Sequence, residues 1–179
     1  MTTTRHPLAE TLHRELDWLE RTIAMRLAVD FGQEGHAGEH DAAPPGLQRG
    51  DPYGDACLDA GLGEGERLAL VLALAPWLRP DALDLLLMRN ATLDRLYSEF
   101  GMIEPAPGQA AVPLPSRATA LFVIAGGDLA RRIAASGLFA AAAPLARHSL
   151  LAPHPQDHDM AAPLTPHPAL VARLIAGAG

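Results

Sequence analysis

Histidine and aspartate residues at two places in the sequence could, by type and spacing, bind a metal ion. The first is the HxxxHD pattern of His36, His40 and Asp41, which on a helix would place both imidazoles on one face. Glycines recur every three residues through this stretch and disfavour a helix. We therefore expect a solvated polar loop there, with no bound metal.

Four further histidines lie close together near the end of the chain, at positions His148, His154, His158 and His167. Imidazoles at this density could bind a metal or respond to pH. His154 and His158 lie in a segment rich in Pro and Asp, so adventitious metal affinity is the favoured interpretation. A small metal-dependent enzyme ranks third among the functions considered, because it needs these imidazoles to converge with a carboxylate in a pocket.

Other residues of catalytic type lack the context that catalysis requires. No serine lies in the GxSxG pattern of a nucleophile elbow. Asp84, Asp94 and Glu99 lie close in sequence to Arg89 and Arg95, which favours ordinary ion pairs over a pair of catalytic carboxylates.

Lysine is absent from the sequence, since all 14 basic residues are arginine. A P-loop of the form GxxxxGKS/T needs a lysine, so this chain contains none. Cys57 is the only cysteine, which excludes an intramolecular disulfide and a cysteine-based zinc site and fits a reducing compartment. We predict that the chain is not an enzyme and uses no cofactor.

The composition indicates which elements must position these residues. Of 179 residues, 49% are hydrophobic and only 4% are aromatic, so we expect an aliphatic core built from helices. A formal net charge of -7 argues against nucleic acid as a partner, since binding phosphate backbones requires a basic surface. The sequence has neither an apolar run long enough to span a bilayer nor the apolar block of a signal peptide, which predicts a cytoplasmic location without membrane contact.

Hydrophobic patterning divides the chain into three segments. Apolar residues at spacings of three and four predict a long amphipathic helix in residues 1–31. Residues 32–63 are rich in Gly, Pro and Asp and are predicted to form a partly disordered loop. Residues 64–179 are predicted to form a winged-helix-like helical domain.

Capping and helix-breaking residues predict several short helices and one hairpin within this domain. Pro76 and Pro80 are expected to end the first, buried helix. The predicted helices cover residues 64–75, 82–88, 91 or 92–100, 117–125, 129–135 and 169–176, and the predicted hairpin pairs residues 147–152 with 161–164. The predicted fold class is mainly α with one small β-hairpin.

The order of short helices followed by a hairpin is typical of a winged-helix domain. A DNA-reading winged helix would carry several Arg or Lys residues on its second helix and on its wing. Arg117 is the only basic residue of the predicted helix over 117–125, and the tip of the predicted hairpin carries Asp157 and Asp159. DNA binding by this surface is therefore disfavoured.

Six short motifs are spread along the chain on both sides of residues 32–63. They are LHRELDWLERTIAMRL (12–27), LALAPWLRP (72–80), RNATLDRLYSEFG (89–101), ATALFVIAGGDLARR (118–132), LF (138–139) and LARHSLL (145–151). In order and spacing they resemble the N-terminal region of AAA-family ATPases of bacterial contractile injection systems, the phage-tail-like machines.

The resemblance implies a winged-helix-like N-terminal domain that positions an AAA motor or engages injection-system components. The ATPase module would lie C-terminal to this domain, so the chain would be either a free-standing relative or the first part of a longer ATPase. The motifs supply candidate interaction residues: Arg89, Asn90, Asp94, Arg95, Glu99, Phe100, Gly101, Asp128 and Arg132.

We therefore expect a non-catalytic protein-interaction or adaptor domain, with an AAA ATPase module or an injection-system component as its partner. The expected contact surfaces are the first helix and residues 94–101, and assembly into a homo-oligomer is left open. The alternative is a winged-helix transcription regulator, which would need a continuous basic face around Arg117, Arg131 and Arg132.

Overall fold

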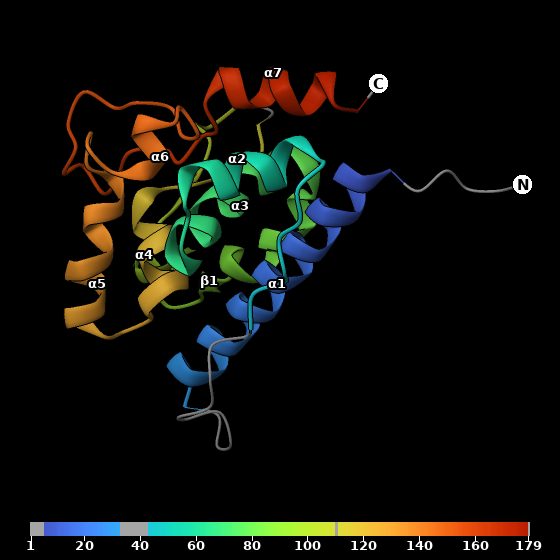
Figure 1. Ribbon diagram of the computed structural model, residues 1–179. Helices are drawn as coiled ribbons and strands as arrows, with labels where there is room; N and C mark the ends of the chain where they lie inside the picture. The colour runs from blue at the N-terminus through green and yellow to red at the C-terminus, as the bar shows by residue number, and fades with distance from the viewer. Residues whose placement is uncertain (1–5, 33–42, 110, 179) are drawn as a thin grey trace, which may run out of the picture.

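The computed structural model describes residues 6–32, 43–109 and 111–178. These residues form seven α-helices, three short 3₁₀ helices (η) and two small antiparallel sheets, which confirms the predicted mainly helical class with a small β-hairpin. In Figure 1, α1 runs diagonally along one side of the molecule, α5 lies at the opposite side and α7 crosses one end. No helix in the described ranges is both long and apolar enough to cross a membrane.

The predicted N-terminal helix is confirmed as α1 (Pro7–Asp30). His6 caps it, since its Nδ1 accepts a hydrogen bond from the amide of Ala9 at 3.4 Å. Pro7 occupies a first-turn position where no amide hydrogen bond is lost. The apolar stripe along α1 is buried and belongs to the same core as the apolar residues of α3.

Helix α3 (Glu64–Leu78) lies at the centre of the molecule, and every residue from Arg67 to Ala75 is buried. The prediction that Pro76 ends this helix is wrong, because α3 continues to Leu78. Pro76 lies in the last turn of α3. A proline there loses the one backbone hydrogen bond that its own nitrogen cannot donate, and few helical bonds follow it. The 3₁₀ helix η1 (Pro80–Leu87) follows.

A helix interrupts the segment that was predicted to be a loop. Within residues 32–63, α2 (Pro52–Ala60) begins at Asp51, whose Oδ1 accepts hydrogen bonds from the amides of Tyr53 at 3.0 Å and Gly54 at 2.8 Å. Gly61 ends it in a left-handed conformation. Both capping residues are helix signals. The helix was not predicted because the residues between them show no hydrophobic periodicity. The predicted disorder and the HxxxHD pattern of residues 36–41 lie outside the described residues.

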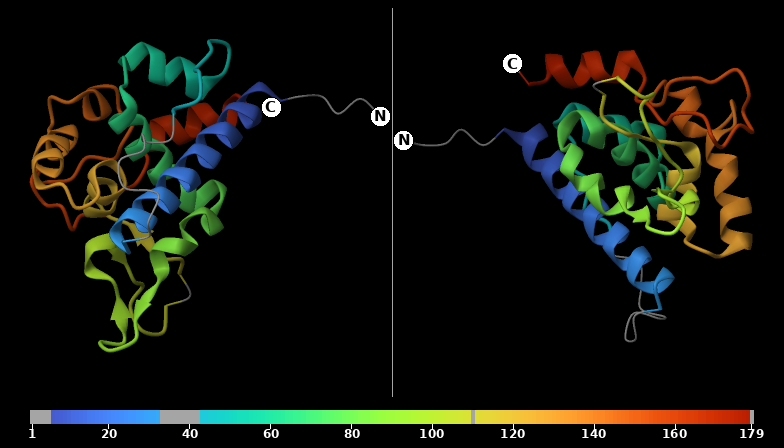
Figure 2. Two further views of the ribbon diagram at one scale, coloured as in Figure 1. Left: turned by 90° about the horizontal axis from the view of Figure 1, so that it is seen from below. Right: turned by 180° about the vertical axis from the view of Figure 1, so that it is seen from behind.

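The helix predicted over residues 91 or 92–100 is wrong. Strands β1 (Arg89–Asn90) and β2 (Arg95–Leu96) form a hairpin instead, followed by the 3₁₀ helix η2 (Ser98–Phe100). The side-chain oxygen of Asn90 accepts hydrogen bonds from the amides of Thr92 and Leu93, and this local turn competes with helix formation. Figure 2 shows the hairpin projecting from the helical body. A second sheet pairs β3 (Met102–Ile103) with β4 (Leu114–Pro115).

Helices α4 (Arg117–Ala125), α5 (Leu129–Ser136) and α7 (Pro168–Ala176) confirm three predictions. Gly137–Phe139 forms η3 and Pro144–Arg147 forms α6. The hairpin predicted between 147–152 and 161–164 is wrong, because each segment has a different partner. Ser116 bridges to Pro163, and Leu151 bridges to Pro166.

The thiol of Cys57 gives a direct test of this packing. Burial raises its pKa to about 12, and only the thiolate is a good nucleophile. We expect the folded chain to react with Ellman's reagent at about pH 8 far more slowly than the urea-denatured chain. Equal rates for the folded and denatured chains would contradict the burial of Cys57.

Candidate functional site

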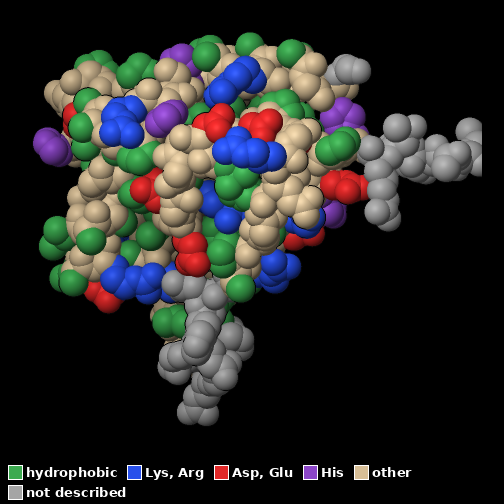
Figure 3. All heavy atoms as spheres, viewed as in Figure 1, with side chains coloured by type: hydrophobic (Ala, Val, Ile, Leu, Met, Phe, Trp, Pro, Cys, Tyr) green, Lys and Arg blue, Asp and Glu red, His purple; other side chains and the backbone are tan. Residues whose placement is uncertain are grey.

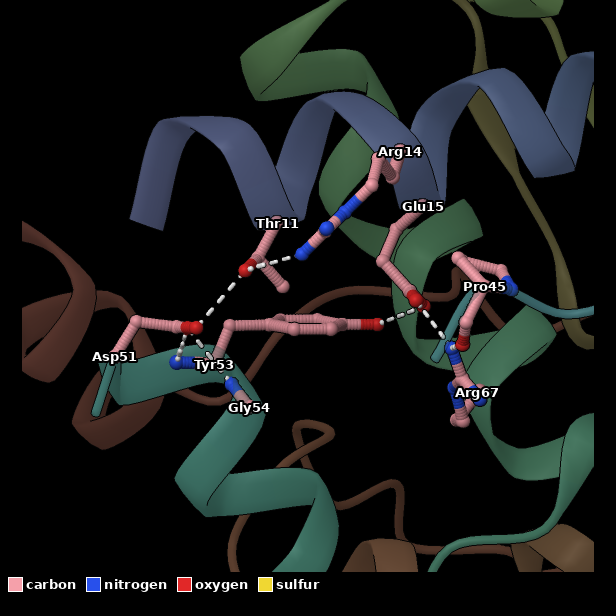
Figure 4. Close-up of polar contacts among 8 residues, drawn as sticks. All are labelled: Thr11, Arg14, Glu15, Pro45, Asp51, Tyr53, Gly54 and Arg67. Atoms are coloured by element: carbon pink, nitrogen blue, oxygen red, sulfur yellow. Dashed lines mark hydrogen bonds and ion pairs between the residues drawn. The ribbon is translucent and has the colours of Figure 1, made fainter. Parts of the chain in front are cut away.

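A buried polar network connects α1, α2 and α3 (Figure 4). Glu15 of α1 is 1% exposed; one carboxylate oxygen accepts a hydrogen bond from the hydroxyl of Tyr53 at 2.8 Å, and the other pairs with Nη2 of Arg67. Thr11 extends the network, since its hydroxyl donates to Asp51 at 2.9 Å. Three segments far apart in the sequence therefore meet at one buried carboxylate.

Arg67 is the cationic centre of this network. Its Nη2 also donates to the carbonyl of Pro45 at 2.7 Å, and its guanidinium lies 5.1 Å from the ring centroid of Trp18. Its Nε is buried without a hydrogen-bond partner in the described chain. An unpaired buried donor is unfavourable. The ion pair between Glu15 and Arg67 must therefore offset the desolvation of both charged groups.

The electrostatics of this network fit a structural role. Burial raises the pKa of the Tyr53 hydroxyl well above its ordinary value, and the neighbouring Cys57 and Glu15 raise it further. A tyrosine that stays protonated donates steadily to Glu15 and does not exchange protons near neutral pH. Glu15, Tyr53 and Arg67 are all buried, so we assign the network to stability rather than catalysis.

The candidate residues from the sequence motif fall at three places, of which the β1–β2 hairpin is the first. Arg89 links β1 to the turn and to the chain after β3, since Nη2 donates to the carbonyl of Asp94 and Nη1 donates to Glu104, both at 2.7 Å. Asn90 makes the turn, Asp94 has a positive φ of 46° with a solvent-exposed side chain, and Arg95 is exposed. Arg89 and Asn90 therefore stabilise the hairpin itself.

Glu99, Phe100 and Gly101 lie in and after η2. Phe100 is fully buried, with its ring centroid 4.9 Å from that of Phe122 in α4. Gly101 has a φ of 64°, and a side chain there would lie 2.8 Å from the amide nitrogen of Thr119. These two residues fasten η2 to α4, which leaves Glu99 as the exposed member of the three.

Asp128 and Arg132 lie at the start of α5, where Asp128 caps the helix by accepting from the amide of Arg131 at 3.1 Å. Three arginines from two helices donate to carbonyls at the end of α4. Arg26 of α1 donates to Val123 at 2.9 Å and to Ile124 at 2.8 Å. Arg131 donates to Ile124, and Arg132 donates to Gly126, both at 3.0 Å. Cations at a helix C-terminus offset its partial negative charge.

The structure brings the end of α1 against η2, so the two segments expected to make partner contacts meet. Phe31, which ends α1, is 46% exposed, and its ring lies edge-on to Tyr97 at a centroid distance of 5.9 Å. Behind them, Phe31 and Tyr97 both contact the buried ring of Phe100. We call the group formed by Asp30, Phe31, Tyr97, Glu99 and Arg132 the Phe31 face.

Two carboxylates lie side by side on the Phe31 face. Partial burial raises the pKa of Glu99, and its charge repulsion and hydrogen bond with Asp30 raise it further. Arg132 acts in the opposite direction and lowers that pKa. Arg132 also donates to the carbonyl of Gly126, so its guanidinium is not devoted to Glu99 alone.

In the part of the chain that the structure describes, the four C-terminal histidines are not brought together into one cluster with a third ligand. His154 and His167 line one cavity with Asp157, and His154 lies 3.9 Å from Asp159. Across the described ranges, no three His, Cys, Asp or Glu side chains are close enough to hold a metal ion. His148 and His158 are exposed.

The sequence analysis named Glu99 and Arg132 as single residues, whereas Asp30, Phe31 and Tyr97 fall within the two segments expected to make contacts without being named. The aromatic partner of Phe31 is Tyr97, which precedes η2 and lies far away in the sequence. The sequence analysis missed Glu15, Tyr53 and Arg67. The available signal was an acidic residue within the apolar stripe of α1 and a basic one within the apolar run of α3.

Comparison of the chain with models of protein families, with curated proteins and with solved structures finds no match to any of them. The assignment of function therefore rests on the geometry described above and on the motif resemblance.

Replacement of Glu15 by Gln should greatly destabilise the fold. It leaves the buried charge of Arg67 without its partner, which costs about 3–5 kcal/mol of the free energy of unfolding. Tyr53→Phe removes one hydrogen bond and should cost about 1–2 kcal/mol. The control is Glu20→Gln, which weakens a half-exposed pair with Arg79 and should cost less than about 1 kcal/mol. Urea unfolding followed by circular dichroism measures all three, and equal losses for Glu15→Gln and Glu20→Gln would refute the network's importance.

Gly101→Ala should be more harmful than Gly61→Ala, although the two positions have nearly the same φ of 64° and 61°. A side chain at Gly61 meets nothing within 4 Å, whereas at Gly101 it would meet the first turn of α4 at 2.8 Å. Both variants should show the cost of a left-handed alanine, about 1–2 kcal/mol. We expect an added cost of about 1–3 kcal/mol for Gly101→Ala alone, measured as the difference in free energy of unfolding. Equal costs would mean that η2 does not pack closely on α4.

Proposed function

We propose that this chain is a non-catalytic protein-interaction domain that uses the Phe31 face to contact its partner. The observation that carries the proposal is the aromatic pair of the half-exposed Phe31 and the partly buried Tyr97, which is supported from behind by the buried ring of Phe100. Aromatic side chains that are held rigidly at a surface lose little entropy on binding and are enriched among residues that dominate binding energy.

The charges on the same face indicate the chemistry of the partner. Asp30 and Glu99 repel each other, and the raised pKa of Glu99 reflects that repulsion together with partial burial. An arginine or lysine from a partner, placed beside an apolar side chain that covers Phe31, would relieve the repulsion. The proposed partner therefore presents a basic residue next to an apolar one.

The motif resemblance identifies the class of partner in this proposal. The chain would act as a winged-helix-like N-terminal domain related to those of contractile injection system ATPases, with an AAA module or an injection-system component as its partner. Two of the motif residues, Glu99 and Arg132, belong to the Phe31 face, which is why the two arguments point to the same surface.

A winged-helix DNA regulator is less well supported, because the arginines it would need are engaged elsewhere. Arg117 is only 6% exposed, and Arg131 and Arg132 donate to carbonyls of α4. On the face drawn in Figure 3, arginines are scattered among acidic and apolar side chains and form no single basic patch. A DNA site that neutralises several phosphates would require such a patch.

The proposal is tested by capturing partners on the tagged chain in cells that express the neighbouring gene cluster, followed by mass spectrometry. We expect an AAA ATPase or a sheath, tube or baseplate protein to be recovered. Phe31→Ala should reduce that recovery at least about ten-fold, as for a residue that dominates an interface.

Trp77→Ala is the matched control for this experiment. Trp77 is 48% exposed, close to the value for Phe31. It lies near Arg79, which pairs with Glu20 of α1, about 16 Å along that helix from Phe31. Equal recovery with both variants would remove the Phe31 face from the interaction. Retention of a specific DNA fragment without any of these proteins would favour the regulator instead.

A further inference from the structure

A cavity of about 340 Å³ lies between η3, α6, the start of α4 and the chain from Leu151 to His167. Small-molecule sites usually measure roughly 300–1,000 Å³ and combine apolar walls with a few polar groups. The walls here include Leu138, Phe139, Leu145, Leu151 and Leu164. We call this space the Arg117 cavity, after the one arginine that lines it.

Arg117 lines the cavity with only part of its hydrogen-bonding capacity in use. Its Nη1 donates to the carbonyls of Gln156 at 3.2 Å and Asp157 at 2.9 Å, and its guanidinium lies 5.4 Å from the ring centroid of Phe139. Its Nε and Nη2 have no hydrogen-bond partner among the residues described, and neither is sealed from solvent. The open edge formed by these two nitrogens is the one that binds a carboxylate through two parallel hydrogen bonds.

Arg117 is desolvated by its burial in the cavity wall, which favours binding of an anion at its open edge. With 6% of its surface exposed, Arg117 has lost most of its hydration, and this desolvation lowers its pKa despite the opposing effect of Asp157 and Asp159. A bound anion would replace part of the lost hydration.

Two hydroxyl groups on the cavity wall also lack partners in the described parts of the chain, those of Ser149 and Thr165. Ser149 follows α6 with a φ of 51°, at a helix end where glycine is the usual residue. A non-glycine residue in this conformation is strained, and such strain is concentrated at functional positions. His167 adds a further donor, because its Nδ1 accepts from the amide of Ala169 at 3.1 Å and leaves Nε2 for the proton of the neutral ring.

We propose that the Arg117 cavity binds a small monocarboxylic acid with a branched aliphatic body. The carboxylate would pair with Nε and Nη2 of Arg117, and the aliphatic part would lie against the leucines of the wall. The Ser149 or Thr165 hydroxyl would donate to a carboxylate oxygen. This inference is independent of the interaction proposed for the Phe31 face.

Asp157 restricts the ligand to a single negative charge. Its carboxylate is on the cavity wall and accepts from the amide of Ala141 at 3.1 Å. The nearby Asp159 adds a second negative charge that acts on Arg117. A dianion such as phosphate would be repelled by both carboxylates and would have no group to cover the leucines.

The test is a titration of the ¹⁵N-labelled chain with 4-methylpentanoate, followed by nuclear magnetic resonance. We expect saturable shifts of amides around the cavity, such as those of Ala152 and His167. The neutral isostere 4-methylpentanamide should bind at least about ten-fold more weakly, because it cannot form the charge-assisted pair with Arg117. Inorganic phosphate should cause no saturable shift at these amides.

Two variants test the assigned groups without removing Arg117, whose bonds to Gln156 and Asp157 also hold the loop. Thr165→Val keeps the shape of the wall and should weaken binding of 4-methylpentanoate several-fold. Asp157→Asn keeps an acceptor for Ala141 and should tighten that binding several-fold by removing a repelling charge. Equal affinity for the acid and the amide, or the absence of saturable shifts with the acid, would overturn the proposal. Weaker binding by Asp157→Asn would contradict the assignment of an anionic ligand.

Discussion

The buried ion pair between Glu15 and Arg67 is the constraint on which the arrangement of this molecule depends. A charge removed from water needs a partner, so α1 can pack on α3 only with these two residues in register. Tyr53 completes the pair and links α2 to it, beside the hydrogen bond from Thr11 to Asp51 and the buried apolar residues of α2. One polar contact thus orients three helices whose apolar surfaces alone, built mainly from Ala and Leu, would pack in many ways.

The last part of α1 is also held, by α4, and the surface proposed for binding lies beside this contact. Arg26 donates to two carbonyls at the end of α4, which places the last turn of α1 beside η2. Phe31 rests on Tyr97 and Phe100 and stays half-exposed. Helix α4 extends from this contact to Arg117 at its start, which lines the cavity.

Local signals in the sequence were sufficient to predict the helices that depend on periodicity or capping. The α1 stripe, Ser116 before α4 and Asp128 before α5 each determine a helix through periodicity or capping. The β1–β2 hairpin was mispredicted because the turn made by Asn90 outweighs the helix-favouring residues that follow it. The α2 helix and the Phe31 face depend on partners far away in the sequence, which periodicity does not reveal. The motif of residues 89–101 contains Glu99, whereas Phe31 lies outside the motifs.

The central claim is that a protein partner covers the Phe31 face, and the most direct test is photo-crosslinking. A chain with the photoreactive residue p-benzoylphenylalanine in place of Phe31 would be irradiated in cells that express the neighbouring gene cluster. The account predicts a covalent adduct with one injection-system protein, joined through a peptide that contains a basic residue beside an apolar one. The same photoreactive residue in place of Trp77 should give no such adduct. An adduct formed at position 77 but not at position 31 would contradict the account.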